Sequence, residues 1–359
     1  MFEHAPRPSP FPKSEPAARR QATLAEIPPI SLLHLRRPEA SYSEAAPQPL
    51  CGDHLHPTVS IIIPTFNRAA ILQSTLTQFL NQPFKDYEIW IIDQSDPDDA
   101  AANFEFVTET GDARLNYLYL TQRGPSNARN EGLARAQGEF ILFTDDDVVL
   151  LTNDFIGAHV RAYDDPKVGG ITGRHIERVL RMNAKHTTCH VDWSGRTIFN
   201  LFGTKRVPVG SCKGSNMSFR MAAIRQVGGF DRGLKFLEET DLSTRVLKAG
   251  WRLMFEPGVE VFHLSVPAGG VREKDRLQAE IVRFECTAYY IIKHRGWLGA
   301  VPFAACFALI AGVRVITFRS LKTFPTLCQA MYRGFLSGRT APDQQIPNAR
   351  IGAGYTKGP

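Results

Sequence analysis

The sequence lacks the cysteine pattern of a zinc ribbon or of a disulfide scaffold. Its six cysteines in 359 residues are scattered and form no C-x-x-C pair, whereas both kinds of structure depend on closely spaced cysteines. It also has no dense Lys/Arg tract. The net charge of +6 is a mild basic excess, which suits phosphate-bearing ligands or an anionic membrane as well as nucleic acid. We therefore expect no nucleic-acid partner.

Several other signals are missing from the chain. Residues 1–20 carry prolines and charges where a secretory signal needs an apolar core, so the cytoplasm is the expected compartment. No G-x-x-x-x-G-K-[ST] occurs, and no G-x-G-x-x-G follows a strand, which argues against a P-loop NTPase or a nicotinamide enzyme. Prolines recur throughout residues 1–57. Because proline blocks helices and sheet ladders, we predict a mostly disordered tail there.

From residue 58 onward, apolar runs alternate with segments of helical periodicity. Strands are expected at Val59–Ile63, Tyr87–Ile92, Leu115–Leu120 and Phe140–Phe143, and helices at Ala69–Leu80, Ser126–Ala136 and Glu239–Ala249. This alternation is typical of an α/β fold with a largely parallel sheet flanked by helices. We expect Ser126 to cap its helix and Gly250 to end the last one. Residues 174–210 show no clean period.

The C-terminal part has a different pattern. Arg276–Lys293 is amphipathic, and Gly296–Val313 is a stretch of 18 residues without a charge. As a helix rising ~1.5 Å per residue, this stretch would span roughly 27 Å, slightly less than a ~30 Å hydrocarbon core. Basic residues flank it on both sides. We therefore predict a helical extension over 266–359 that lies on the inner leaflet of a membrane, the alternative being a buried core helix.

Polar residues follow three of the expected strands at the points where they end. They are Pro64–Arg68, Asp93–Asp96 and the triplet Asp145–Asp147. In open α/β sheets the carboxyl ends of parallel strands line the ligand crevice, so these residues are expected to converge. Three adjacent carboxylates repel one another unless a cation compensates them, and a hard divalent ion such as Mg²⁺ is the natural partner. The alternative for the triplet alone is a solvated acidic turn.

A second acidic cluster, Glu238–Asp241, stands at the start of an expected helix. Acidic residues stabilise a helix N-terminus through the dipole, and this purely structural role accounts for Asp241. It does not account for two adjacent glutamates after Phe236 and Leu237. A carboxylate shielded by these apolar residues could have a raised pKa and act as a general base. His263 lies in an apolar context, where a satisfied core histidine is the default and a metal or phosphate contact is the sharper alternative.

Taken together, these segments resemble the family 2 glycosyltransferases, which have the GT-A fold. The resemblance runs from about residue 59 to residue 263 and rests on five motifs in order. They are VSIIIPTFNR, EIWIIDQSDPDD, GPSNARNEGLARAQGEFILFTDDD, GSNMSFR and FLEETDLSTRVLKAGWRL. It implies a GT-A domain over 58–265. Two departures from the family pattern are a Glu in place of the usual catalytic Asp, and Asp93-Gln94-Ser95 in place of Asp-Asp-Gly-Ser.

The resemblance also implies a role for individual residues. Glu239 would be the general base, and Asp147 and His263 would hold Mg²⁺ or Mn²⁺ on the donor diphosphate. The residues implied on the donor side are Pro64, Thr65, Asn67, Arg68, Asp93, Arg129, Asp145 and Asp146. Those implied on the acceptor side, or in support of the site, are Asn216, Glu238 and Asp241.

The expected activity is an inverting transfer of a sugar from a nucleotide-diphosphate donor to a hydroxyl of a carbohydrate or lipid-linked acceptor, in polysaccharide or glycolipid assembly. Two alternatives remain open at this point: transfer to a polyprenyl phosphate, and a non-catalytic protein that binds nucleotide sugars. Intact acidic residues in both clusters argue against the non-catalytic alternative.

Overall fold

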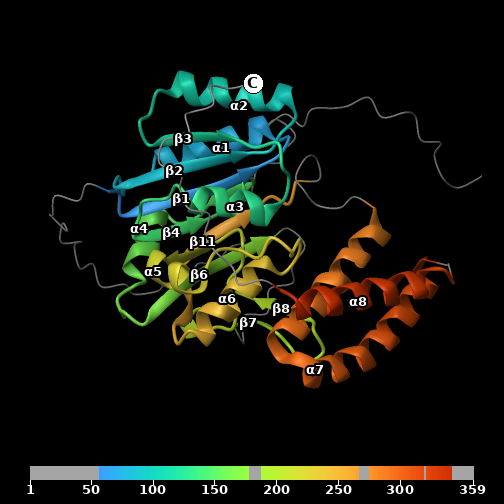
Figure 1. Ribbon diagram of the computed structural model, residues 1–359. Coiled ribbons are helices and arrows are strands. Elements are labelled where there is room, and N and C mark those ends of the chain that lie inside the picture. The colour runs from blue at the N-terminus through green and yellow to red at the C-terminus, as the bar shows by residue number, and fades with distance from the viewer. Residues whose placement is uncertain (1–55, 178–186, 267–274, 319–320, 342–359) are drawn as a thin grey trace, which may run out of the picture. The chain divides into compact units, whose positions relative to one another are not determined.

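The computed structural model describes residues 56–177, 187–266, 275–318 and 321–341. The disordered tail predicted for 1–57 therefore lies outside the described residues, except for its last two positions. The described strands and helices follow the alternation expected from the sequence, with additional strands in the aperiodic region (Figure 1).

A nine-stranded mixed sheet forms the centre of the fold, in the order β3-β2-β1-β4-β10-β6-β11-β5, with β9 paired to β11. Its strands are β1 (Val59–Thr65), β2 (Tyr87–Asp93), β3 (Leu115–Tyr119), β4 (Phe140–Phe143), β5 (Val148–Leu150), β6 (Val168–Glu177), β9 (Val207–Pro208), β10 (Met217–Arg220) and β11 (Arg252–His263). The first four strands pair in parallel. β10 is antiparallel to both of its neighbours, and β6 and β11 are parallel to each other.

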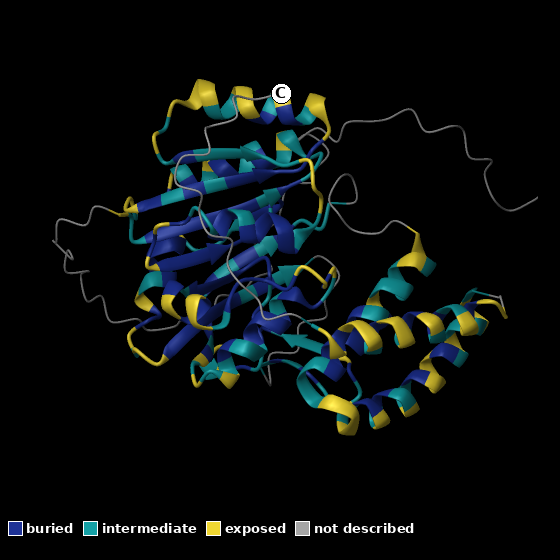
Figure 2. Cartoon of the chain, in the orientation of Figure 1, coloured by how far each residue is buried: buried dark blue, intermediate teal, exposed yellow. Residues whose placement is uncertain are grey.

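Helices cover both faces of this sheet. They are α1 (Ala69–Leu80), α2 (Pro97–Thr110), α3 (Pro125–Leu133), α4 (Phe155–Arg161), α5 (Met221–Val227) and α6 (Glu238–Lys248). Ile61 and Ile63 of β1 pack in one apolar core with α1 and α4, whereas Ile62 packs in a second core with α3, α5 and α6. β1 is thus buried on both faces, as Figure 2 shows for the central strands. This confirms the α/β fold with a sheet flanked by helices, because strands buried on both sides read as continuous apolar runs.

Two local predictions need correction. Ser126 does not cap α3: the helix begins at Pro125 after Gly124, whose φ is 138°. The Ser126 hydroxyl instead donates to the carbonyl of Leu234 at 3.0 Å. Proline is favoured at the first helical position, so it sets the start of the helix here. The polar residues after Asp96 also begin a helix, α2, which buries few side chains and therefore lacks a strong apolar period.

The C-terminal part forms two helices, α7 (Arg276–Phe318) and α8 (Thr323–Arg339). Gly296, with φ 60° and ψ −161°, breaks α7 into two segments, so the 18-residue uncharged stretch begins at the break. α7 and α8 lie side by side (Figure 1). They share an apolar core that includes Phe284, Phe303, Phe307 and Leu327. A hairpin of β7 (Thr188–Val191) and β8 (Thr197–Asn200) contacts this part, because Arg295 donates to the carbonyls of Val191 and Asp192.

Candidate active site

The loops after β1 and β2 are joined to each other by hydrogen bonds. The backbone N–H of Asn67 donates to Oγ of Ser95 at 2.8 Å, and its side-chain amide donates to Asp96 at 2.7 Å. Asn67 has a φ of 53°, a left-handed conformation that asparagine tolerates better than most residues. Two of the three polar clusters at strand ends therefore converge, as the position of these ends in a parallel sheet predicts.

Two residues of the aspartate triplet, Asp146 and Asp147, are buried, whereas Asp145 is partly exposed. The buried Asp146 accepts hydrogen bonds from Oγ1 of Thr65 at 2.7 Å and from the Arg68 guanidinium at 2.9 Å. Burial raises the pKa of Asp146 to about 6, although Arg68 acts in the opposite direction. The same guanidinium lies 3.2 Å from Oδ2 of Asp147. Asp146 thus holds Arg68 in place, and Arg68 in turn compensates the charge of Asp147.

Asp145 and Asp147 meet His263, the last residue of β11. β11 pairs with β5 so that His263 stands opposite Val148, directly after the triplet. Nε2 of His263 lies 3.0 Å from Oδ1 of Asp147 and 3.6 Å from Oδ2 of Asp145. Burial by itself would lower the pKa of His263, but the carboxylates of Asp147 and Glu177 outweigh it and raise the pKa to about 9.

This group has the chemistry of a divalent-cation site. Asp145, Asp147 and His263 each offer a ligand atom within 4.8 Å of the others. Oδ1 of Asp147 is buried and faces Nε2 of His263 at 3.0 Å, and a buried carboxylate is costly unless a cation compensates its charge. Two carboxylates and an imidazole suit Mn²⁺ or Mg²⁺ better than soft metals. The residues present therefore fit such an ion.

Arg129 on α3 connects the triplet with the second acidic cluster. Its guanidinium donates to Oε1 of Glu238 at 2.7 Å and lies 3.6 Å from Oδ1 of Asp145. Leu237, with a φ of 70°, adopts a left-handed conformation just before α6, so that Glu238 and Glu239 fall in the first helical turn. Partial burial, and then the charge of Glu238, raise the pKa of Glu239 to about 8. This matches the shielded, basic carboxylate expected from the sequence.

Asp93 and Asn216 are buried and bonded to protein groups. The Asp93 carboxylate accepts hydrogen bonds from the backbone of Ser95, the amide of Asn103 and the hydroxyl of Tyr117, at 2.7–2.9 Å. The Asn216 amide donates to the carbonyls of Arg174 and Val259, on β6 and β11. Both side chains therefore hold strands and loops together, and their contacts with donor or acceptor remain predictions.

Asp241 is fully buried and connects α6 with α7. Its carboxylate lies 2.8 Å from Arg245 of the same helix, and 2.6 Å and 2.8 Å from Lys293 and His294 of α7. Lys293 also pairs with Asp231 at 2.6 Å. Burial would raise the pKa of Asp241, but His294, Arg245 and Lys293 outweigh it and hold this pKa well below its usual range. Asp241 thus anchors α6 to α7.

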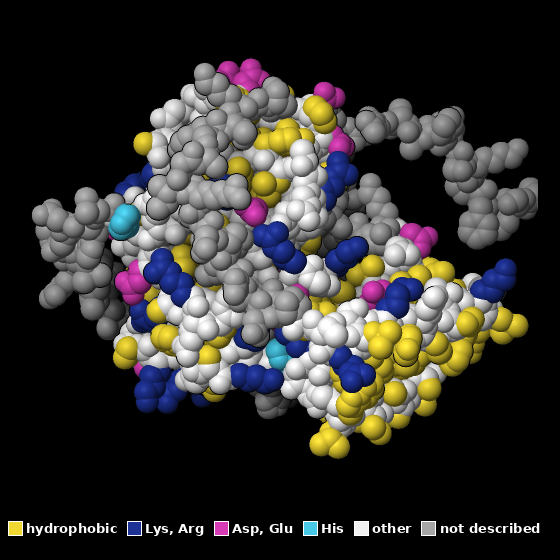
Figure 3. Space-filling view, viewed as in Figure 1, with side chains coloured by type: hydrophobic (Ala, Val, Ile, Leu, Met, Phe, Trp, Pro, Cys, Tyr) yellow, Lys and Arg dark blue, Asp and Glu magenta, His cyan; other side chains and the backbone are white. Residues whose placement is uncertain are grey.

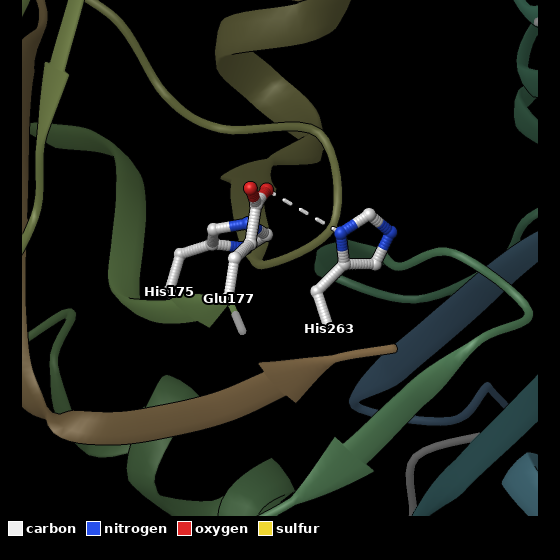
Figure 4. A group of neighbouring side chains, drawn as sticks. All are labelled: His175, Glu177 and His263. Carbon is white, nitrogen blue, oxygen red and sulfur yellow. Dashed lines mark hydrogen bonds and ion pairs between the residues drawn. The ribbon is translucent and has the colours of Figure 1, made fainter. Parts of the chain in front are cut away.

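Sequence reasoning missed two residues of the site, His175 and Glu177. They lie on β6, where Glu177 is the register partner of His263 on β11. Nε2 of His175 lies 2.5 Å from Oε1 of Glu177, which lies 3.5 Å from Nδ1 of His263 (Figure 4). The only sequence signal was an H-x-E pair with strand alternation, inside a region that showed no clean period.

Known glycosyltransferases are similar to this chain in sequence. Residues 60–228 match the sequence model of glycosyl transferase family 2. A GalNAc(5)-diNAcBac-PP-undecaprenol beta-1,3-glucosyltransferase of Campylobacter jejuni is 39% identical over 99 residues, which are 27% of this chain and 31% of that protein. A pre-mycofactocin glycosyltransferase of Mycobacterium tuberculosis is 28% identical over 229 residues, 61% of this chain and 45% of that protein. The matched regions thus span less than half the length of these two curated relatives.

Solved structures show the same fold at low sequence identity. A mannosyltransferase from Pyrobaculum calidifontis, in complex with GDP-Man and Mn²⁺, has a TM-score of 0.51 at 18% identity and covers 85% of this chain and 91% of that one. TarS 1–349 of S. aureus, in complex with UDP-GlcNAc, has a TM-score of 0.54 at 16% identity and covers 82% and 89%. The fold is therefore that of the GT-A glycosyltransferases. The matched part of the chain, residues 60–228, is a family 2 glycosyltransferase sequence.

The buried cluster around Asp241 predicts a large effect on stability. Asp241→Ala leaves the charge of Arg245 without its carboxylate and removes the hydrogen-bond partner of His294, so the free energy of unfolding should fall by about 3–5 kcal/mol, measured by chemical denaturation. The control is Asp164→Ala. Asp164 is an exposed partner of Arg206, and losing such a pair should cost only about 0–1 kcal/mol. Equal effects of the two substitutions would contradict the anchoring role of Asp241.

Proposed function

We propose that the chain transfers a sugar, with inversion, from a nucleotide-diphosphate donor to a hydroxyl acceptor in polysaccharide or glycolipid assembly. The observation that carries this proposal is the Arg129 bridge between two carboxylate groups of different character. On one side Arg129 contacts Asp145, one of the candidate cation ligands, and on the other it pairs with Glu238, the neighbour of Glu239, whose raised pKa suits proton transfer. Residues 58–265 would form the catalytic domain, and residues 266–359 a helical extension.

The donor would bind at the carboxyl ends of β1, β2 and β4. Pro64, Thr65, Asn67, Arg68 and Asp93 come from the loops or strand ends that the hydrogen bonds above join. Asp145, Asp147 and His263 would hold Mg²⁺ or Mn²⁺. When bound, such an ion neutralises the charge that develops on the leaving nucleoside diphosphate. Relatives solved with GDP-Man, UDP-GlcNAc and Mn²⁺ support these ligand classes.

Glu239 would act on the acceptor. It accepts the proton of the acceptor hydroxyl while the oxygen forms a bond to the anomeric carbon and the bond to the diphosphate breaks. Glu238 supports this role, because its negative charge makes Glu239 more basic, and the hydrogen bond from Arg129 holds Glu238 in place. Because Arg129 contacts both Glu238 and Asp145, it would connect the proposed base with the donor site.

Glu239→Gln tests the base. Turnover should fall by roughly two to four orders of magnitude, the usual range for a positioned base, while nucleotide binding is retained. Since Glu239 must be deprotonated to act, the rate of the wild type should rise with pH until about 8 and then level off, and this rise should disappear in the variant. The measurements are nucleoside diphosphate release with a panel of nucleotide sugars, and calorimetry.

The matched control is Glu131→Gln, also on a helix near the site but with a partly exposed carboxylate that pairs with Arg135 and Arg232. It should leave rate and pH profile unchanged. An inactive Glu238→Gln beside a fully active Glu239→Gln would move the role of base by one residue. A wild type that binds nucleotide sugars but releases no nucleoside diphosphate, with or without metal, would favour the non-catalytic alternative.

Asp147→Asn tests the cation site. The substitution keeps the shape of the side chain but removes the charge next to Oδ1, so metal-dependent transfer should be lost and nucleoside diphosphate should bind more weakly in the presence of Mn²⁺. The control is Asp112→Asn, whose carboxylate pairs with Arg114 away from the triplet. Full activity of Asp147→Asn at limiting Mn²⁺ would exclude Asp147 as a ligand.

We further propose that the extension binds the cytoplasmic face of a membrane and that the acceptor is lipid-linked or close to the membrane. α7 is long and apolar enough to cross a bilayer, with 17% of its most apolar window buried. The helix that continues after the break at Gly296, over 297–318, contains Pro302 and the charged Arg314, which favours a helix that lies in the interface over a straight span. The printed substrate of the Campylobacter relative is an undecaprenol-linked saccharide, which supports a lipid-linked acceptor, including the polyprenyl-phosphate alternative.

Charge and exposure of the extension favour an anionic bilayer as its partner. Between Cys286 and Pro342 the chain has no Asp or Glu but seven Lys and Arg. Large apolar side chains on α7 and just before α8 are exposed, among them Leu298 at 91%, Leu309 at 74% and Leu321 at 85%. Figure 3 shows hydrophobic side chains gathered over α7 and α8, with basic ones among them. Apolar groups within a basic surface are the composition of helices that lie in an anionic interface.

Replacing Leu298, Leu309 and Ile316 together by Glu tests this surface. Since burying each such side chain contributes about 1.5–3 kcal/mol, affinity for vesicles of phosphatidylcholine and phosphatidylglycerol should fall at least about tenfold in a co-sedimentation assay. Phe104→Glu, on exposed α2, should bind like the wild type. A wild type that stays in the supernatant with anionic vesicles at low salt would overturn the membrane proposal.

A further inference from the structure

His263 has two ring nitrogens that face different groups. Nε2 points to the candidate cation ligands, with Oδ1 of Asp147 at 3.0 Å. On the other side of the ring, Nδ1 lies 3.0 Å from Oγ of Ser265 and 3.5 Å from Oε1 of Glu177. An imidazole that ligates a metal through one nitrogen must carry its proton on the other. The groups around Nδ1 therefore decide whether Nε2 can act as a ligand.

Glu177 is itself held by a directed chain of hydrogen bonds. The Ser215 hydroxyl lies 2.6 Å from Nδ1 of the buried His175 and can donate its proton there. Nε2–H of His175 then donates to Oε1 of Glu177 at 2.5 Å. This oxygen thus accepts on one side and faces His263 on the other, and Figure 4 shows Glu177 between the two rings. The rings of His175 and His263 are 5.1 Å apart.

The strand register fixes this arrangement. β6 and β11 run parallel, so Val261 is the partner of His175 and His263 is the partner of Glu177. Alternate residues of a strand point to the same face, so His175 and Glu177 share the face that His263 occupies on the next strand. The chain of contacts is therefore built on rigid elements, although Glu177 is the last residue of its strand.

We propose that Glu177, oriented by His175, is a positioning residue for the cation site: it holds the proton of His263 on Nδ1, so that Nε2 faces Asp145 and Asp147 as a ligand. Metal-bound histidines generally donate their second N–H to a carboxylate or carbonyl, and this partner fixes the ring and the tautomer. The inference rests on the proposed cation site and deepens it, because it assigns a role to two residues outside the aspartate triplet.

His175, Glu177 and His263 also offer ligand atoms within 4.8 Å of one another, as a separate cation site would require. In that case His263 would have to ligate two ions through its two nitrogens, and Oε1 of Glu177 would have to exchange its bond with His175 for a metal. The existing hydrogen bonds favour the positioning role, and the stoichiometry of metal binding distinguishes the two.

The test is Glu177→Gln in the full chain, titrated with Mn²⁺ alone and followed by the electron paramagnetic resonance signal of free Mn²⁺. Affinity should fall about 10- to 100-fold, the usual effect of removing such a partner, with one ion bound per chain before and after. In the presence of Mg²⁺, nitrogen NMR of His263 should show Nδ1–H in the wild type and a mixture of tautomers in the variant.

Controls separate this role from folding and from the proposed activity. Glu260→Gln removes a carboxylate that pairs with Arg174 near the same strands and should leave Mn²⁺ affinity unchanged. His175→Gln keeps a donor toward Glu177 and should lose less affinity than Glu177→Gln. Unchanged Mn²⁺ affinity in Glu177→Gln, or a drop from two bound ions to one, would overturn the inference. Normal Mn²⁺ binding without sugar transfer would instead count against the proposed function alone.

Discussion

The compensation of buried negative charge is the constraint on which this structure depends. Asp146, Asp147, Glu238 and Asp241 are all buried, and an isolated carboxylate in such a place would cost several kcal/mol. Each has a cation nearby: Arg68 for the two aspartates of the triplet, Arg129 for Glu238, and Lys293 for Asp241. These cations come from the segment between β1 and α1, from α3 and from α7, so the acidic site also connects distant elements.

The compensation is uneven, and the unevenness has chemical consequences. Asp146 and Asp241 have basic partners at hydrogen-bond distance and serve as anchors. Asp147 faces His263 as well as Arg68 at the candidate cation site, whereas the pKa of Glu239 is raised by burial and by the charge of Glu238. Clustered carboxylates attract a cation, and a carboxylate with a raised pKa attracts a proton. In the proposed function, metal binding and proton transfer would therefore fall to different carboxylates.

The Asp241 cluster also connects the site with the C-terminal helices. Glu239 and Asp241 share the first turn of α6, and Asp241 is bonded to Lys293 and His294, just before the break at Gly296. The segment after this break carries the exposed apolar side chains. The proposed base and the proposed membrane surface are therefore connected through one buried ion cluster and one helix, which would give a short structural path between a lipid-linked acceptor and the group that would deprotonate it.

The sequence by itself determined those features of the fold and the site that depend on residues close together in the chain. The apolar run before Pro64 predicted a strand buried on both faces, the triplet after Phe143 predicted a site at a strand end, and the glutamates after Leu237 predicted a shielded carboxylate. Strand periodicity and element ends are encoded in neighbouring residues, so they can be read without a fold. Only the tertiary structure decided that Asp146 faces inward, that Lys293 pairs with Asp241, and that Glu177 stands beside His263. These contacts join residues 52 to 86 positions apart or depend on the register of β6 against β11, which no local pattern specifies.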